Sequence, residues 1–118
     1  MTRRHPEQEI QRSVVSHLRC RGARAVWWHV PNGGARRKTE AAILKGLSVR
    51  AGVADICVVH DGKFFALELK APSGRSTAAQ IAFRDEINAA GGFAAEAVGI
   101  DAALRCLESW GLLRGQAQ

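Results

Sequence analysis

The sequence predicts an α/β fold in a single domain, with a small mixed β-sheet that has a central antiparallel hairpin and is flanked by helices. Two apolar, β-rich runs between Val53 and Lys70 are joined by Asp61-Gly62, which is among the strongest signals for a two-residue hairpin turn. On both sides of this hairpin, apolar residues recur at helical spacing. At 118 residues with 47% hydrophobic content, the chain can bury a core without disulfides.

Before the hairpin, the sequence predicts two helices and one strand. Residues 6–21 form a helix, because Pro6 and acidic residues begin it and apolar residues recur at every fourth position. Residues 25–30 read as a strand, and residues 31–34 as a loop dense in turn residues. Thr39 can cap a helix that runs to about Arg50.

After the hairpin, a loop at residues 71–75 precedes a helix at about 77–90, for which Thr77 to Gln80 match the capping box. A strand at 93–98 follows, and Asp101 can cap a last helix that Gly111 closes. The expected order is α-β-α-β-β-α-β-α, with a domain at residues 6–112 and a frayed tail at 113–118.

The net charge of +6 is concentrated in one half of the chain. Residues 1–50 contain eleven Lys and Arg against three acids, whereas residues 51–118 contain six against eight. A basic surface attracts nucleic acid phosphates, although a solvated face is the plain alternative. The three cysteines are widely spaced, which predicts neither a disulfide framework nor a zinc site. No apolar run of membrane-spanning length and no signal peptide pattern is present, so a cytoplasmic protein is expected.

The hairpin register brings carboxylates together. With a two-residue turn, Asp55 lies opposite Glu68, at a separation where like charges destabilise the pair. A hard cation bound by these oxygens removes the repulsion. Lys70 projects on the same face as Glu68, because side chains alternate along a strand. The three residues therefore predict a divalent-metal site that polarises a phosphoryl oxygen and activates water. The alternative is two exposed carboxylates, each with a local cation.

Other candidate residues have plain alternatives. Gln80 can serve the helix cap alone, or it can also reach the site. Glu7 lies on the apolar stripe of the first helix and is expected to face inward as a further metal ligand, with Glu9 as the competing acid. His29 is either a core histidine or a functional one. Trp27 and Trp28 alternate faces, so at most one is expected to be exposed for base stacking.

The combination of five motifs resembles the virus-type replication-repair nuclease domain, VRR-NUC, of the PD-(D/E)xK nuclease superfamily. The motifs are E-Q-E-I-Q at 7–11, H-V-P-N-G-G at 29–34, G-V-A-D-I at 52–56, E-L-K at 68–70 and G-R-S-T-A-A-Q at 74–80. They occur in the order and with the spacing of the family. One departure is Ala54, where the family usually has proline before the aspartate. Proline there fixes the backbone and supplies no chemistry.

The resemblance implies a restriction-endonuclease-like core and hydrolysis of DNA phosphodiester bonds that depends on Mg²⁺ or Mn²⁺. It implies Asp55, Glu68 and Glu7 as metal ligands, Lys70 as the catalytic lysine and Gln80 as the supporting glutamine. Stand-alone domains of this size resemble phage or bacterial homodimeric enzymes that act on branched DNA, such as Holliday junctions or flaps, in repair and recombination. A non-catalytic DNA-binding module that retains the fold is the alternative. The expected DNA-contacting residues are His29, Asn32, Arg36, Arg37, Lys38 and Arg75.

Overall fold

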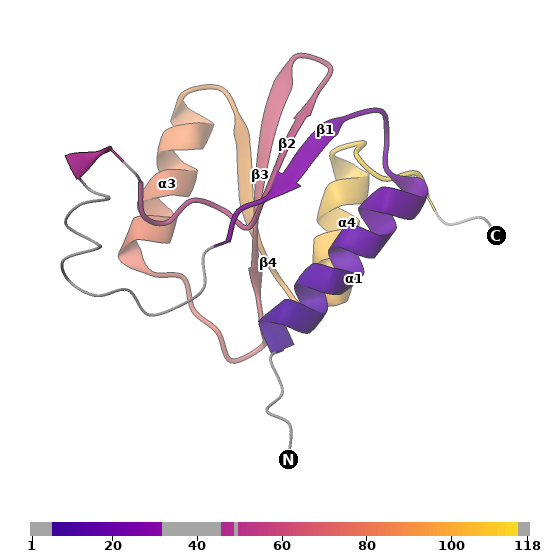
Figure 1. Cartoon of the computed structure of the whole chain (residues 1–118), viewed down its shortest axis with the longest axis horizontal. Coiled ribbons are helices and arrows are strands. Elements are labelled where there is room, and N and C mark those ends of the chain that lie inside the picture. Colours follow the sequence, from indigo (N-terminus) through magenta and orange to yellow (C-terminus); the bar gives the residue numbers. More distant parts are fainter. Residues whose placement is uncertain (1–5, 32–45, 49, 116–118) are drawn as a thin grey trace.

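The computed structural model describes residues 6–31, 46–48 and 50–115. Its elements, labelled as in Figure 1, are α1 (Pro6–Arg21), β1 (Val26–His29), β2 (Ile56–His60), β3 (Lys63–Lys70), α3 (Ala78–Ala89), β4 (Phe93–Val98) and α4 (Ile100–Ser109). The helix expected between Thr39 and Arg50 lies largely outside the described residues. The other expected helices and strands are all present.

The four described strands form one mixed sheet in the order β1-β2-β3-β4. The β1–β2 and β2–β3 pairs are antiparallel, and the β3–β4 pair is parallel. A chain that leaves β3 must cross over before it can run parallel to it, and α3 makes that crossover. The predicted mixed sheet with a central antiparallel hairpin is therefore confirmed.

The hairpin has the register that its turn predicts. His60 pairs with Lys63, and Cys57 pairs with Ala66. Asp61 and Gly62 have φ angles of 51° and 75°, the pair of positive values that a type I′ turn requires. Because that turn matches the twist of the flanking strands, it fixes which side chains share a face.

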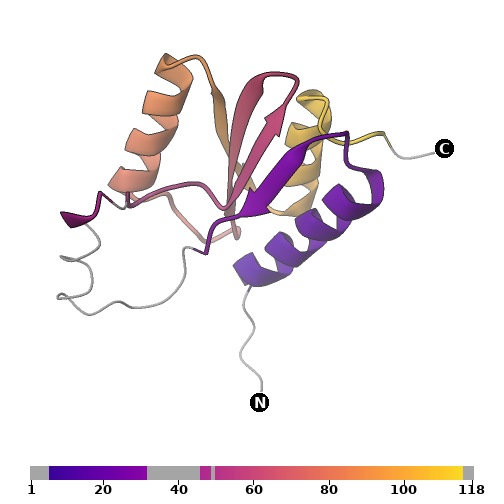
Figure 2. The ribbon, with the colours of Figure 1, turned by 45° about the horizontal axis from the view of Figure 1, so that its top comes forward.

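The elements pack in three layers, with α1 and α4 on one face of the sheet and α3 on the other (Figures 1 and 2). The face toward α1 and α4 is apolar, as predicted, and these helices contribute further buried residues such as Val14 and Leu107. The buried strand residues on this face are Ile56, Val58, Phe65, Leu67 and Leu69. They form the larger part of the core and hold the hairpin in the middle of the domain.

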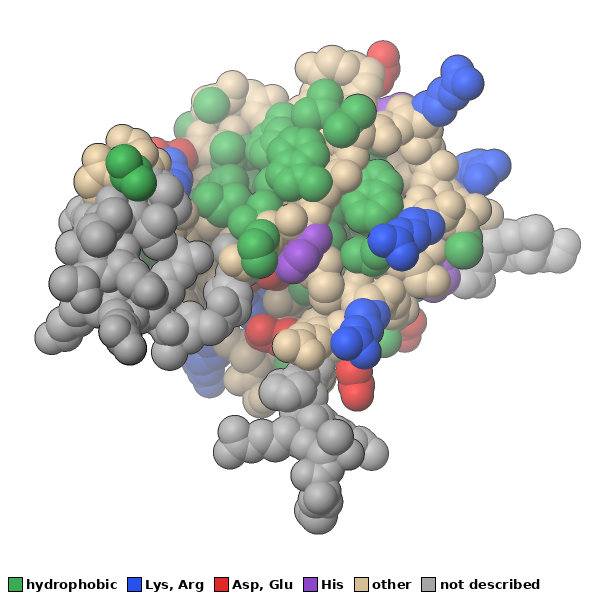
Figure 3. All heavy atoms as spheres, in the orientation of Figure 1, with side chains coloured by type: hydrophobic (Ala, Val, Ile, Leu, Met, Phe, Trp, Pro, Cys, Tyr) green, Lys and Arg blue, Asp and Glu red, His purple; other side chains and the backbone are tan. Residues whose placement is uncertain are grey.

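The opposite face of the sheet is covered only in part. Phe83 of α3 packs on Ala54 and Ala66 in a second, smaller core cluster. Val26, Trp28 and Val59 share this face, but their side chains are exposed. Figure 3 shows hydrophobic side chains gathered over this part of the sheet. The face that carries Asp55 and Glu68 is thus divided between a packed part, an exposed apolar part and a polar end.

One boundary prediction is wrong. Asp101 does not cap α4, because the helix begins one residue earlier and Gly99 occupies the N-cap position without a side-chain hydrogen bond. Asp101 instead lies in the first turn, where its charge favours the helix dipole. Near the end of the described chain, Leu113 is buried and forms an isolated bridge with Gly22. No helix in the described residues has the length and apolar character to cross a bilayer.

Candidate active site

Asp55 is fixed at the point where the chain enters β2. Its Oδ2 accepts a hydrogen bond of 2.8 Å from the backbone N–H of Leu69 on β3. Its carbonyl oxygen accepts one from Val30 N at 2.8 Å and lies 3.1 Å from His29 Nδ1. Asp55 is therefore held between the end of β1 and the end of β3.

Glu68 lies on β3 beside Asp55 and is only 3% exposed. Its Oε1 accepts a hydrogen bond of 2.9 Å from Gln80 Nε2 and lies 3.6 Å from the Nζ atom of Lys70. Its Oε2 is buried and has no hydrogen-bond partner among the described residues. Lys70 is also buried, at 6% exposure. The alternative of two exposed carboxylates is therefore wrong for Glu68.

The electrostatics of the site favour a bound cation. Burial raises the pKa of Glu68 to about 8, and the negative charge of Asp55 adds to this effect. Lys70 lowers the pKa of Glu68, but less than burial and Asp55 raise it. Burial and the charge of Asp55 also raise the pKa of Cys57 to about 11. The ionised form of Glu68 is therefore disfavoured by the described residues alone, and a bound cation would relieve this.

Gln80 has both of the functions that the sequence left open. Its Oε1 accepts a hydrogen bond from the backbone N–H of Thr77 at 2.8 Å, which completes the predicted capping box. Its Nε2 donates to Glu68. The first turn of α3 therefore adjoins the carboxylates, and the free N–H groups of a helix N-terminus favour phosphate.

Gly52 allows the segment before Asp55 to approach α3. It has a φ angle of +82°, and a Cβ atom at this position would lie 2.4 Å from the backbone carbonyl carbon of Ala79. Only glycine fits both the conformation and the space. The glycine of the G-V-A-D-I motif therefore brings Asp55 and Gln80 into the same site.

Glu7 lies in the first turn of α1 and is exposed, so it is not buried as an inward-facing residue would be. Its carboxylate nevertheless reaches the loop after β3. A Cβ atom built on Gly74 would lie 3.2 Å from Glu7 Oε1 and 3.5 Å from the Cδ atom of Lys70. Glu9, the competing acid, is exposed as well.

The donor set fits a hard divalent cation. Asp55 and Glu68 offer carboxylate oxygens, which Mg²⁺ and Mn²⁺ prefer, and Glu68 Oε2 has no other partner among the described residues. Within residues 6–31, 46–48 and 50–115, no three His, Cys, Asp or Glu side chains are grouped closely enough to hold a metal. The structure thus assembles two carboxylates, with Glu7 nearby and outside the pair.

The expected DNA-contacting residues fall into two groups. His29 and Arg75 are exposed, and His29 is attached to the site through its contact with Asp55. His29 is therefore not a core histidine. The other four, Asn32, Arg36, Arg37 and Lys38, lie outside the described residues. Of the two tryptophans, Trp28 is 42% exposed and Trp27 is half-buried on the opposite face.

Sequence reasoning missed an acidic residue beside the site. Glu96 on β4 lies next to Glu68 in the parallel register and so shares its face. Its Oε1 accepts a hydrogen bond of 2.9 Å from Ser76, whose Oγ accepts one from Arg84 of α3. The signal was the single acid in an otherwise apolar strand, but only the parallel pairing places it beside Glu68.

No protein-family model and no curated protein matches the chain. A solved structure named "VRR_NUC domain protein" superposes with a TM-score of 0.74 at 21% identity, covering 92% of this chain and 90% of its own. A second, named "VRR_NUC domain", has a TM-score of 0.62 at 13% identity and covers 91% and 99%.

These comparisons define the class of fold: a small α/β domain with a four-stranded mixed sheet between helices. More particularly, the chain has the fold of VRR-NUC domains. The resemblance noted in the sequence motifs is confirmed at this level.

Proposed function

We propose that this protein is a divalent-metal-dependent endonuclease that hydrolyses DNA phosphodiester bonds, with selectivity for branched DNA. The observation that carries the proposal is the pair of carboxylates: the buried Oε2 atom of Glu68 accepts no hydrogen bond from a described donor, and Asp55 lies beside it. A buried acceptor without a hydrogen bond is costly, and a cation satisfies it. The VRR-NUC fold supports the same conclusion.

Each side chain has a distinct role in the proposed site. Asp55 and Glu68 hold Mg²⁺ or Mn²⁺, with Glu7 as a further ligand from α1. When bound, the cation supplies Lewis-acid charge at the phosphate. Lys70 places an ammonium group in a buried setting, where it stabilises negative charge developing on the phosphate. Gln80 fixes the orientation of the Glu68 carboxylate through Oε1.

Selectivity for branched DNA rests on shape and phosphate contacts more than on base readout. The chain is basic, and His29 and Arg75 are exposed. We further propose a homodimer that spans a junction, in which the exposed Val26, Trp28 and Val59 side chains meet a second copy. Sedimentation tests this: Trp28→Ser should shift the protein toward monomer, and a wild-type monomer at all concentrations would contradict it.

The experiment compares the wild type with Asp55→Asn, which retains an acceptor for Leu69 N–H and removes the charge. Labelled four-way junction, flap and linear duplex are incubated with Mg²⁺, Mn²⁺ or EDTA. The wild type should cut the junction and the flap, but not the linear duplex, when Mg²⁺ or Mn²⁺ is present, and should cut nothing in EDTA. Asp55→Asn should bind the branched substrates without cutting them. Intact binding with no cleavage by the wild type under any condition would identify a non-catalytic DNA-binding module instead.

A further inference from the structure

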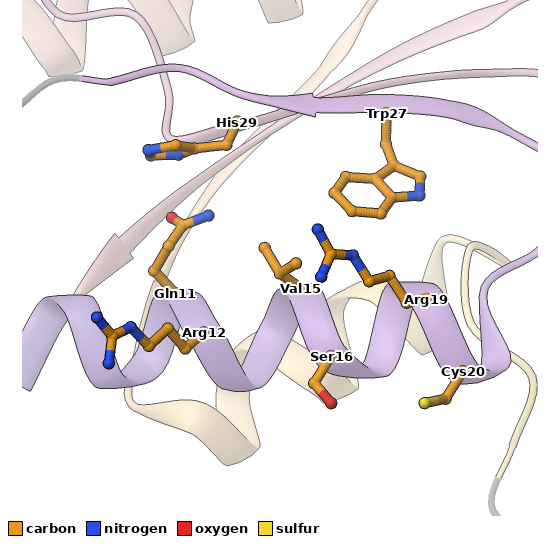
Figure 4. Close-up of a pocket in the computed structure, with 8 residues that line it drawn as sticks. All are labelled: Gln11, Arg12, Val15, Ser16, Arg19, Cys20, Trp27 and His29. Carbon is orange, nitrogen blue, oxygen red and sulfur yellow. The ribbon is translucent and has the colours of Figure 1, made fainter.

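A groove between α1 and the edge strand β1 has the composition of a nucleic acid contact. It is lined by Gln11, Arg12, Val15, Ser16, Arg19, Cys20, Trp27 and His29, with no acidic side chain among these described residues. Trp27 and His29 project from β1 toward α1, and Gln11, Val15 and Arg19 project from α1 toward them (Figure 4). With a volume of about 660 Å³, the groove lies within the range of ligand sites, about 300–1,000 Å³.

The charge in this groove is not compensated. Arg12 and Arg19 are exposed, and neither forms an ion pair within the part of the chain that the structure describes. They are seven residues apart on α1, which corresponds to about two turns and roughly 10 Å along the helix axis. Two arginines at this distance can each contact a different phosphate of one strand.

The lining of the groove includes a side-chain amide, from Gln11, and an indole ring, from Trp27. The Nε2 atom of Gln11 is buried, and no described residue pairs with it. Buried amide donors are nearly always hydrogen-bonded, so a small shift of this side chain toward the groove would allow it to meet an acceptor there. The half-buried indole of Trp27 presents an aromatic surface between β1 and α1.

One end of the groove adjoins the backbone of Asp55. His29 lines that end, and its Nδ1 lies 3.1 Å from the backbone carbonyl oxygen of Asp55. The groove lies on the α1 face of the sheet and the carboxylates on the α3 face, so a strand that leaves the groove at His29 must pass the end of β1 to reach them.

We infer that this groove binds an unpaired strand of DNA. In a duplex the base faces are already stacked on one another, so only an unpaired strand can offer them to an indole. Flaps and open junctions contain such strands. The inference rests on the proposed function only in taking the strand to be a substrate; binding itself requires neither metal nor cleavage.

The experiment measures binding in EDTA, where no cleavage occurs. A labelled oligothymidine of roughly 15 nucleotides, long enough for a small single-strand site, is titrated with each protein by fluorescence anisotropy, with a linear duplex alongside. Arg12→Ala/Arg19→Ala should weaken single-strand binding about tenfold and reduce the salt slope by roughly 1.4, at about 0.7 per lost phosphate contact. Lys63→Ala/Arg105→Ala, which removes two exposed charges outside the groove, should leave affinity within about twofold.

A second readout locates the strand. The oligothymidine should quench intrinsic fluorescence in the wild type and in Trp110→Phe, and quench it much less in Trp27→Phe. Equal losses in the groove and control double variants would overturn the inference, as would an equal loss of duplex binding. Single-strand binding that depends on the groove, in a protein that never cuts, would sustain this inference and refute the nuclease. If the wild type cleaves flaps but Arg12→Ala/Arg19→Ala binds the single strand as tightly as wild type, the nuclease proposal stands and this inference is refuted.

Discussion

Gln80 Nε2 donates a hydrogen bond of 2.9 Å to Glu68 Oε1, and the same side chain caps α3 through its Oε1 atom. The helix start and the carboxylate site thus share one residue. The amide orients Glu68, leaving Oε2 as the oxygen without a partner among the described residues. Substitutions at Thr77 and Gln80, the two ends of the capping box, can therefore separate the effect of the helix cap from the effect of the contact with Glu68.

Gln80→Glu should abolish the orienting contact and preserve the cap. A glutamate at this position still accepts from the Thr77 N–H and favours the helix dipole, so the cap should be retained. Its carboxylate also lies beside Glu68, so the metal-free protein should lose stability as the pH rises and both groups ionise. Losing the donor to Glu68 should lower metal-dependent cleavage of a flap substrate about 10–100-fold, as for other residues that support metal ligands.

Thr77→Ala is the matched variant for the cap. It removes the side chain that accepts from Gln80 N, at a cost of about 1 kcal/mol in unfolding free energy, and leaves the Gln80–Glu68 contact available. Cleavage by the folded protein should remain near wild type. If Thr77→Ala and Gln80→Glu reduced cleavage equally, Gln80 would act only through the helix.

Lys70→Met should abolish cleavage and leave cation binding intact. Methionine keeps much of the buried apolar stem and removes the ammonium group that lies 3.6 Å from Glu68 Oε1. Because a positive charge is removed beside the carboxylates, Mn²⁺ affinity measured by calorimetry should be equal or tighter. The control is Lys63→Met, at an exposed position next to the hairpin turn. Unchanged turnover in Lys70→Met would remove Lys70 from the mechanism.

The hairpin and its polar residues could be predicted because their determinants are local. Asp61-Gly62 specifies a turn, the turn fixes the register, and alternation then places Lys70 beside Glu68. The helices α1 and α3 follow from apolar periodicity and from a capping box. These signals lie within a few residues of one another in the chain.

The positions of other residues could not be predicted, because they depend on contacts between segments that are far apart in the chain. Glu96 lies beside Glu68 only because β4 pairs in parallel with β3 in one particular register, with α3 between them in the chain. Trp27 faces α1 because β1 pairs with β2 so that Trp27 lies opposite Val58, on the α1 face. Glu7 was placed by helical periodicity alone, which does not show that an exposed residue can still reach Gly74.

Glu68 should make the metal-free protein less stable as the pH rises. Its pKa is about 8 in the folded protein, against an ordinary value of 4.5. Between these values the folded state retains a proton that the unfolded state has released, so the contribution to stability is complete below pH 4.5 and is lost as the pH rises toward 8. Glu68→Gln is neutral in both states and lacks this dependence.

Urea unfolding in EDTA at pH 5 and pH 8 tests this, with the other titrating groups common to both proteins. The decrease in unfolding free energy from pH 5 to pH 8 should be larger in the wild type than in Glu68→Gln. An equal or larger decrease in the variant would show that Glu68 is ionised in the metal-free folded protein.

Gly52→Ala should destabilise the protein and separate the two halves of the site. An added Cβ meets the Ala79 backbone at 2.4 Å, and the φ of +82° disfavours any side chain. The left-handed conformation costs about 1–2 kcal/mol and the overpacking about 1–3 kcal/mol more. Gly62→Ala is the control: its φ of +75° is similar, but its Cβ would meet nothing within 4 Å.

Chemical denaturation of both variants distinguishes conformation from contact. Gly62→Ala should lose only the conformational part, about 1–2 kcal/mol, and retain cleavage, because the hairpin turn lies away from the carboxylates. Gly52→Ala should lose more stability and also most of its cleavage, since the segment that carries Asp55 must move away from the helix that carries Gln80. Equal losses of stability in the two variants would mean that the close approach of Gly52 to α3 does not hold the site together.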